Sequence, residues 1–238
     1  MTVQFDQVVF AYGMDEIYSS GGIRFLRDRG PYQFDMQFPG GAADPVLQLD
    51  ASLYFNGAPQ YVELPAGRRA EFYAQIPTGT MTLLLCHAPT AATGVIWSTW
   101  NNTAGGVNQG VFALAQTSSA VAPRLYQPQG GAGLPYISGT VAHTLSRKYV
   151  VSYTMEVTPR GLTDGTTNGA AWIGGAFGAA VYAPALSPRI GSHPSGAGGY
   201  QGRQYFSCLI RGALSSADLA FYSRLIAEGG RPFCWRQT

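Results

Sequence analysis

The chain has 238 residues, which is enough for one large domain and too few for two. Charged residues make up only 12% of it, and Lys148 is the sole lysine among 15 basic residues. Neutralising a phosphate backbone requires a dense Lys/Arg stripe, so the composition argues against a nucleic-acid partner. A surface with so few charges favours coverage by subunit contacts. The alternative is a neutral, Thr/Ser/Gly-rich surface that stays soluble by itself.

The N-terminal stretch MTVQFDQVVFAYGMDE has no basic segment, and Asp6 breaks its apolar run. We therefore expect no secretory signal peptide, and synthesis in a host cytoplasm. No run of about 18 apolar residues occurs, so we expect no insertion into a membrane.

The 31 Gly and 15 Pro residues, with frequent Thr, Ser and Tyr, indicate many short strands joined by tight turns. Alternation and turn residues predict strands at 8–12, 32–38, 52–55, 61–64, 72–76, 81–87, 95–100, 110–116, 124–127, 149–157, 170–173 and 202–210.

The segment from Tyr200 to Glu228 predicts a strand followed by the one principal helix. Gly202 opens the strand, and its residues Phe206, Cys208 and Ile210 share one face. Ser215 and Asp218 form a capping-box pattern, so we expect a helix over 216–227 that ends at Gly229 and Gly230. Its buried stripe consists of Leu219, Tyr222, Leu225 and Ile226.

This strand followed by ALSSADL resembles the closing segment of concanavalin A-like, or laminin-G-like (LamG-like), jelly rolls. LYFNG at 53–57 followed by YVELP at 61–65 resembles the early hairpin of that family, and the segments 94–98, 148–153 and 189–192 follow in the family's order. The resemblance covers about residues 47–228. It implies an all-β, two-sheet antiparallel jelly-roll sandwich with one short C-terminal helix, as a single domain over 1–238. Residues 1–45 would be an extension or outer strands, and 229–238 a tail. The family often carries an acidic residue in the closing strand, where Tyr205 and Phe206 stand here, so any role of that acid is not inherited.

The sequence indicates no catalytic residue, metal site or cofactor. Jelly-roll glycoside hydrolases place carboxylates on one strand at period two, and no such pattern occurs here. Asp28 and Asp35 are interpreted as solvated turn carboxylates. The three histidines are isolated, and no calcium-loop pattern is present. We therefore expect a protein that is not an enzyme.

A candidate carbohydrate site follows the strand at 95–100. Trp97, Trp100, Asn101 and Asn102 combine flat rings with amides, the chemistry that a sugar site uses. The two tryptophans would point to opposite faces of a strand, so at most one is a platform. The alternative is that Trp97 packs inside and Trp100 covers the sheet edge.

The termini are the candidate interface with other subunits, because arginine and aromatic residues anchor interfaces. The residues are Arg24, Arg27, Arg29, Arg231, Phe233, Trp235 and Arg236. Alternatively, the N-terminal segment supplies strands of the sandwich and Trp235 folds back on its own core. Cys86 and Cys208 are expected to be buried thiols. Cys234 is expected to be more exposed, with a disulfide to Cys208 or to a neighbouring subunit left open.

Three functions follow from these features. The first is a non-enzymatic structural or adhesion protein of a phage virion (capsid decoration, tail or fibre), as a homo-oligomer or part of a larger assembly with some glycan binding. The alternative is a soluble carbohydrate-binding lectin domain, and the third is a polysaccharide hydrolase or lyase. Fold alone does not choose between them.

Overall fold

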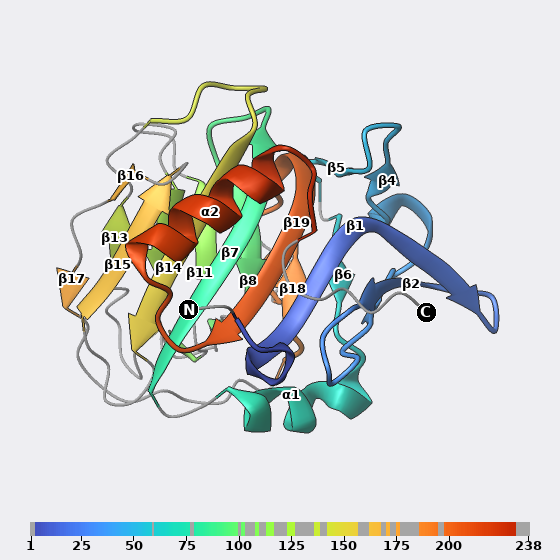
Figure 1. Cartoon of the computed structure of the whole chain (residues 1–238). Helices are drawn as coiled ribbons and strands as arrows, with labels where there is room; N and C mark the ends of the chain where they lie inside the picture. The colour runs from blue at the N-terminus through green and yellow to red at the C-terminus, as the bar shows by residue number, and fades with distance from the viewer. Residues whose placement is uncertain are drawn as a thin grey trace.

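The computed structural model is a two-sheet antiparallel sandwich that has, among the residues it describes, two α-helices on its outside (Figure 1). It describes residues 3–58, 60–76, 79–99, 101–102, 108–109, 113–116, 123–126, 136–138, 142–156, 162–167, 170–171, 175–176, 186–194 and 198–231. All pairs of named strands are antiparallel.

The first sheet is centred on the closing strand of the chain. Strand β19 pairs on one edge with β7, and on the other edge with β1 and β5. From β7 the sheet continues through β14 and β15 to β16, while β4 pairs with β5 and β17 with β15. The strands are β1 (Val8–Ser20), β4 (Val46–Leu47), β5 (Leu53–Asn56), β7 (Thr80–Pro89), β14 (Tyr149–Glu156), β15 (Leu162–Thr167), β16 (Ala170–Ala171), β17 (Gly175–Ala176) and β19 (Gln201–Arg211).

The second sheet has the order β3, β6, β18, β8, β11, β12, β13. Strand β2 pairs with both β1 and β3 and so joins the two sheets at one edge. The strands are β2 (Ile23–Asp28), β3 (Met36–Gln37), β6 (Val62–Glu63), β8 (Gly94–Ser98), β11 (Ala113–Gln116), β12 (Pro123–Tyr126), β13 (Tyr136–Ser138) and β18 (Arg189–Ile190), with β9 (Asn101–Asn102) and β10 (Asn108–Gln109) as a separate pair.

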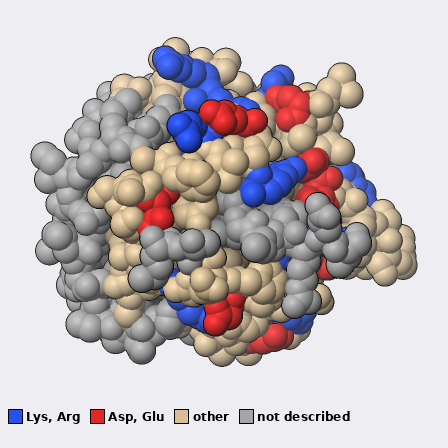
Figure 2. Space-filling view, in the orientation of Figure 1, with Lys and Arg blue, Asp and Glu red and all other residues tan. Residues whose placement is uncertain are grey.

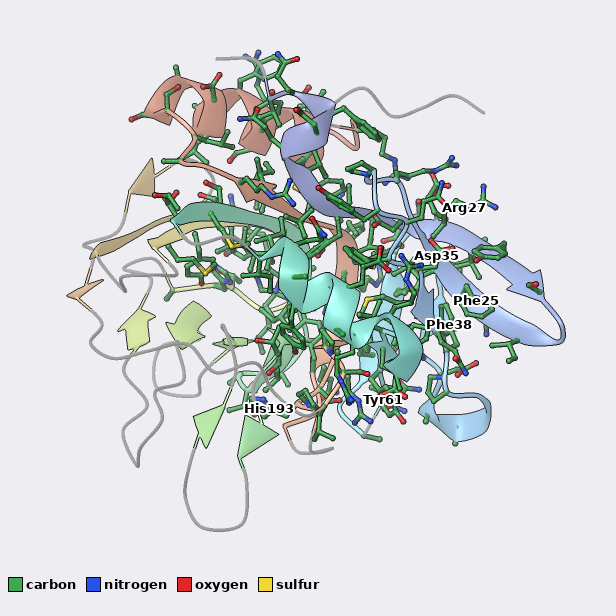
Figure 3. The ribbon with its side chains drawn as sticks, turned by 90° about the horizontal axis from the view of Figure 1, so that it is seen from below. Phe25, Arg27, Asp35, Phe38, Tyr61 and His193 are labelled. Carbon is green, nitrogen blue, oxygen red and sulfur yellow. The ribbon has the colours of Figure 1, made fainter. Side chains whose placement is uncertain are left out.

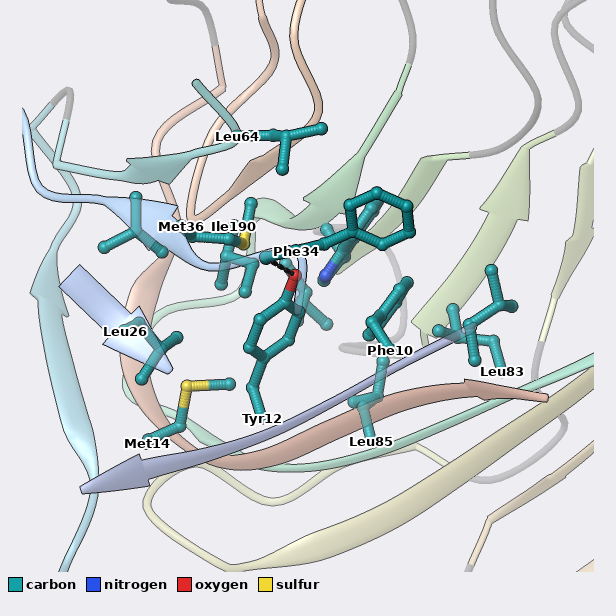
Figure 4. Close-up of a cluster of buried hydrophobic side chains, with 14 of the residues drawn as sticks. Phe10, Tyr12, Met14, Leu26, Phe34, Met36, Leu64, Leu83, Leu85 and Ile190 are labelled. Carbon is teal, nitrogen blue, oxygen red and sulfur yellow. Dashed lines mark hydrogen bonds between the residues drawn. The ribbon is translucent and has the colours of Figure 1, made fainter. Parts of the chain in front are cut away.

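The core lies between the two sheets and is rich in aromatic rings. Phe10 on β1 stacks on Trp97 on β8 with ring centroids 5.1 Å apart, and Phe72 packs against both. The Tyr12 hydroxyl donates a 2.6 Å hydrogen bond to the Phe34 carbonyl, so the one polar atom of this ring is satisfied inside the core (Figure 4).

Helix α2 (Ser216–Ala227) covers the outer face of the first sheet, across β14, β7 and β19 (Figure 1). Its Tyr222 and Ile226 pack there against Leu84, Phe206 and Cys208. Strand β7 is therefore buried on both faces, which explains its continuous apolar run. The helix bounds and the cap are confirmed: the Ser215 hydroxyl accepts the Asp218 amide at 3.2 Å.

One strand prediction is wrong, and a second holds only in part. Residues 72–76 belong mostly to α1 (Arg69–Gln75), a short helix that follows η3 (Ala66–Arg68). Phe72 is buried, and Tyr73 and Ile76 pack against the same core, a spacing that one helical turn accommodates. Residues 32–38 are also not a strand throughout, because only Met36–Gln37 pairs with β2.

The N-terminal segment is part of the sandwich. Strand β1 follows η1 (Phe5–Gln7), and its residues Phe10, Tyr12 and Met14 are buried in the core. The segment continues through the β1–β2 hairpin to η2 (Gly41–Ala43). Cys86 and Cys208 are buried free thiols, as expected, and Cys234 lies outside the described residues.

Candidate functional site

The β1–β2 hairpin has one face toward the core and one toward solvent. Leu26 and Asp28 are buried on the inner face, whereas Phe25 and Arg27 alternate onto the outer face and are partly exposed. Tyr18 on β1 pairs with Phe25, and their rings stack with centroids 5.4 Å apart. The register of β1 against β2 shifts between Tyr12 and Ile17. This irregularity separates the outer half of the hairpin from the half that lies beside β19.

Asp28 holds the chain together where the hairpin meets the next loop. Its Oδ1 accepts the amides of Ala11 and Gly30, both at 2.7 Å, and its Oδ2 accepts the amide of Phe34 at 2.8 Å. Burial raises the pKa of Asp28 to about 7, against the lowering effect of these three hydrogen bonds and with a further raising effect of Asp35. Asp28 is therefore a buried structural carboxyl, which corrects its interpretation as a solvated turn residue.

Asp35 is fixed in the same way from the other side of the loop. Its Oδ1 accepts the Asp28 amide at 2.8 Å, and its Oδ2 accepts the Tyr18 hydroxyl at 2.5 Å. Partial desolvation and this hydrogen bond to Asp35 raise the pKa of Tyr18 to about 12, so the phenol keeps its proton at neutral pH.

These groups line a cavity of about 430 Å³ at the base of the hairpin, which we call the hairpin pocket. Figure 3 shows Arg27 and Asp35 next to each other at the hairpin, away from Tyr61 and His193. The lining residues are Phe5, Tyr18, Arg27, Asp28, Arg29, Gly30, Pro31, Gln33 and Asp35.

The two arginines of the pocket differ in their partners. Arg29 holds Glu16 through Nε at 3.1 Å and Nη2 at 2.6 Å. The guanidinium carbon of Arg27 lies 4.9 Å from the centroid of the Tyr18 ring, a cation–π arrangement. Within the described part of the chain, Arg27 forms no ion pair.

The predicted carbohydrate residues do not form a described surface site. Trp97 is fully buried and stacked on Phe10, so the alternative that it packs inside is the one the structure has, and it is not a surface platform. Trp100 lies outside the described residues. Asn101 and Asn102 form β9, and only their backbone is described.

The predicted interface arginines are largely engaged within their own chain. Arg24 pairs with Asp44 at 3.2 Å and lies over the Phe38 ring, and Arg231 pairs with Asp15. Phe233, Trp235 and Arg236 lie outside the described residues.

Sequence reasoning missed Tyr18 and Phe5 as pocket residues because it missed the hairpin. The available signal was Gly21-Gly22 between two apolar-containing runs, a two-residue turn pattern. A second signal was Asp28-Arg29-Gly30, since an Asp that accepts the amide two residues on is a common turn.

The face drawn in Figure 2 mixes acidic and basic side chains over a largely uncharged surface. Among the described helices, none combines the length and hydrophobicity needed to span a bilayer. Nor do the described His, Cys, Asp and Glu side chains form a group of three or more that could hold a metal ion.

No model of a known protein family matches this sequence, and no curated protein matches it. Solved structures do match. The receptor-binding domain of botulinum neurotoxin C/D mosaic serotype is 9% identical with a TM-score of 0.64, over 95% of this chain and 52% of that chain. A Trypanosoma rangeli sialidase mutant with trans-sialidase activity is 16% identical with a TM-score of 0.63, over 95% of this chain and 34% of that chain.

A third match comes from work describing cell entry of botulinum neurotoxin type C as dependent on interaction with two ganglioside molecules. It is 8% identical with a TM-score of 0.63, over 92% of this chain and 51% of that chain. The chain thus spans about half the length of the neurotoxin chains and a third of the sialidase. At these identities the matches establish the fold, a concanavalin A-like jelly roll.

Proposed function

We propose that this chain is a non-enzymatic, lectin-like module that binds a glycan in the hairpin pocket. The observation that carries the proposal is the lining of that pocket. Arg27 offers N–H donors, and Tyr18 and Phe5 offer aromatic surface. Each oxygen of Asp35 accepts one hydrogen bond within the protein and so keeps a second lone pair for a ligand. Sugars have hydroxyls that both donate and accept and an apolar ring face, so this set of groups suits them.

The comparisons support the same class of function. A neurotoxin that depends on gangliosides and a sialidase both contain a segment with this fold. Because the identities are low, they support a glycan-binding role only as an analogy between folds.

The carboxylates of the pocket favour binding over hydrolysis. A glycosidase needs one carboxyl free to donate a proton and a second free to attack or to activate water. Both oxygens of Asp28 accept backbone amides, and both oxygens of Asp35 accept hydrogen bonds from Asp28 and Tyr18. These contacts use the carboxylates to build the pocket.

A glycan array probed with the labelled protein tests the proposal, followed by calorimetry with the best sugar. We expect binding by the wild type and a loss on the order of tenfold in Tyr18→Ala, which removes a wall of the pocket. Phe221→Ala is the matched control, because Phe221 is an exposed aromatic residue on α2 that does not line the pocket. Wild-type protein that binds no glycan, or Tyr18→Ala that binds as well as Phe221→Ala, would refute the proposal.

A subunit of a larger assembly, such as the phage virion expected from composition, is the second candidate function. The observation that favours it is the β4–β5 hairpin, which projects apolar side chains into solvent. Val46 and Leu47 are 52% and 44% exposed, and Leu49 at the turn is fully exposed. Exposed apolar groups gathered on one hairpin are typical of a protein interface.

Light scattering coupled to size exclusion tests this candidate. We expect oligomers of the wild type and monomers when Val46, Leu47 and Leu49 are all changed to Ser. Leu145→Ser is the control, because Leu145 is 46% exposed on a different loop. A wild-type monomer at every concentration would count against assembly, and mass spectrometry of purified particles would test the virion assignment directly.

A further inference from the structure

We propose that the ligand of the hairpin pocket is an acidic sugar whose carboxylate pairs with Arg27. This inference rests on the proposed glycan-binding function and specifies its ligand class. It depends on one asymmetry among the described residues. The other charged groups that line the pocket, Asp28, Arg29 and Asp35, form ion pairs or hydrogen bonds within the protein, whereas Arg27 contacts the Tyr18 ring and forms no ion pair.

The charge of Arg29 is already balanced. Its guanidinium contacts Glu16 with two nitrogens, and both side chains are mostly buried, at 18% and 19% exposure. A ligand anion would have to compete with this carboxylate in a partly desolvated place, where separating an ion pair is costly. Arg29 is therefore a wall of the pocket and not the group that receives a new anion.

The two carboxyls of the pocket are also engaged. Asp28 accepts three backbone amides and is almost completely buried. Asp35 accepts the Asp28 amide and the Tyr18 hydroxyl. Neither carboxyl reaches Arg27 as an ion pair. The fixed position of Asp35 keeps the Tyr18 ring in place under the Arg27 guanidinium.

Arg27 is partly exposed, lines the pocket, and rests over the Tyr18 ring at 4.9 Å. Stacking on a ring restricts the orientation of a guanidinium without using its N–H donors. An oriented planar fork of donors matches the two oxygens of a carboxylate. The Arg27 guanidinium, oriented by the Tyr18 ring, therefore suits a planar ligand group with one negative charge.

The neighbouring acids select against a more highly charged ligand. A phosphate group would bring close to two negative charges next to Asp35 and to the partly ionised Asp28, and this repulsion is unfavourable. A carboxylate brings one. The cavity of about 430 Å³ is within the range of small-molecule sites and leaves room for a sugar ring beside Phe5 and Gln33.

Calorimetry with glucuronic acid and glucose tests the inference, because these sugars differ only in the carboxylate at C6. We expect the wild type to bind glucuronic acid more tightly by on the order of tenfold, the size of one charge-assisted hydrogen bond. Arg27→Gln should reduce this preference to about one while keeping weak binding of glucose. Arg27→Lys should restore part of it, because the charge returns without the planar fork.

Arg224→Gln is the matched control, because Arg224 is an exposed arginine on α2 outside the pocket, and it should keep the wild-type preference. Equal binding of glucuronic acid and glucose by the wild type would overturn the inference and leave the proposed function standing. An affinity for acetate equal to that for glucuronic acid would also overturn the inference, because any carboxylate would then suffice. If the wild type bound neither glucuronic acid nor glucose and no glycan on the array, the proposed function itself would fail.

Discussion

At the residue scale, the hairpin pocket depends most on the buried carboxyl group of Asp28. It receives amides from β1, from the turn at Gly30 and from Phe34, three points that no other described side chain connects. Gly30 lies close beside it: a Cβ there would be 3.0 Å from Asp28 Oδ1 and 3.2 Å from the Phe10 Cα, so these neighbours would have to move by a few tenths of an ångström. Asp28 thus fixes the loop that follows the hairpin at three backbone positions.

We expect Asp28→Asn to destabilise the fold by about 1–3 kcal/mol, because the amide nitrogen would replace an oxygen that accepts a buried N–H. The pH dependence has a definite sign. The folded-state pKa of Asp28 is raised from 3.8 to about 7. The stabilisation that Asp28 gives to the fold is therefore fully present below pH 3.8 and is lost as the pH rises through 7.

Urea unfolding at pH 5.5 and at pH 8 measures this effect. The free-energy gap between wild type and Asp28→Asn should be larger at pH 5.5. Asp6→Asn is the control, because Asp6 is exposed in η1 and should show almost no gap at either pH. If the free-energy difference between wild type and Asp28→Asn were larger at pH 8, Asp28 would instead be ionised in the folded protein and stabilised as a carboxylate.

At the scale of elements, the β1–β2 hairpin places Tyr18 and Arg27 on one outer face. Its turn contains Gly21 at φ 57° and Gly22 at φ 79°, both in the left-handed region, and a Cβ on either would touch nothing within 4 Å. A substitution there therefore changes backbone strain without changing packing.

We expect Gly22→Ala to cost about 1 kcal/mol, because an L-residue is disfavoured in the left-handed region. Gly67→Ala is a matched control: its Cβ would also meet nothing, and Gly67 does not have a positive φ. Thermal melts of the two variants compare them directly. Equal melting temperatures would mean that the turn is not held in the left-handed conformation.

The elements that sequence could predict are those specified by neighbouring residues. The cap at Ser215 and Asp218, the helix after it and the alternation of Phe206, Cys208 and Ile210 were all predicted and are confirmed, because each depends on residues close in the chain. Helix α1 was predicted as a strand, because a window as short as 72–76 fits both periods and only packing of Phe72 on Phe10 and Trp97 decides.

The candidate site could not be predicted in the same way. Asp28 is buried because Ala11 and Phe34 donate to it, and the first of these lies 17 residues away across an irregular strand pair. Trp97 was considered for the surface and for the core, and no local pattern separates those environments for one aromatic residue in a strand. Trp97 is in the core because its ring stacks on Phe10, which lies on a strand of the opposite sheet.

At the scale of the whole molecule, the sandwich encloses uncharged histidines. His87 on β7 is fully buried, and its Nδ1 lies 3.0 Å from the Tyr200 hydroxyl. His143 is stacked on Tyr149 with ring centroids 4.0 Å apart, and the two imidazoles lie 5.1 Å apart. Burial lowers the pKa of His143 to about 4, and burial together with His143 lowers the pKa of His87 well below its usual value.

These shifts predict acid sensitivity of the entire fold. The folded-state pKa values of both histidines are lowered from 6.5. The stability that the two neutral histidines contribute is therefore present above pH 6.5 and is lost as the pH falls toward 4, because the unfolded chain then binds protons that the folded protein excludes. We expect His143→Phe, which keeps a ring on Tyr149, to lose less unfolding free energy than the wild type between pH 7.5 and pH 5. Asp28 titrates with the opposite sign, but it does so in both proteins and cancels in the comparison. Equal losses in the two proteins would mean that His143 takes up its proton without unfolding, and the buried pair would then have to open locally while the two sheets stay together.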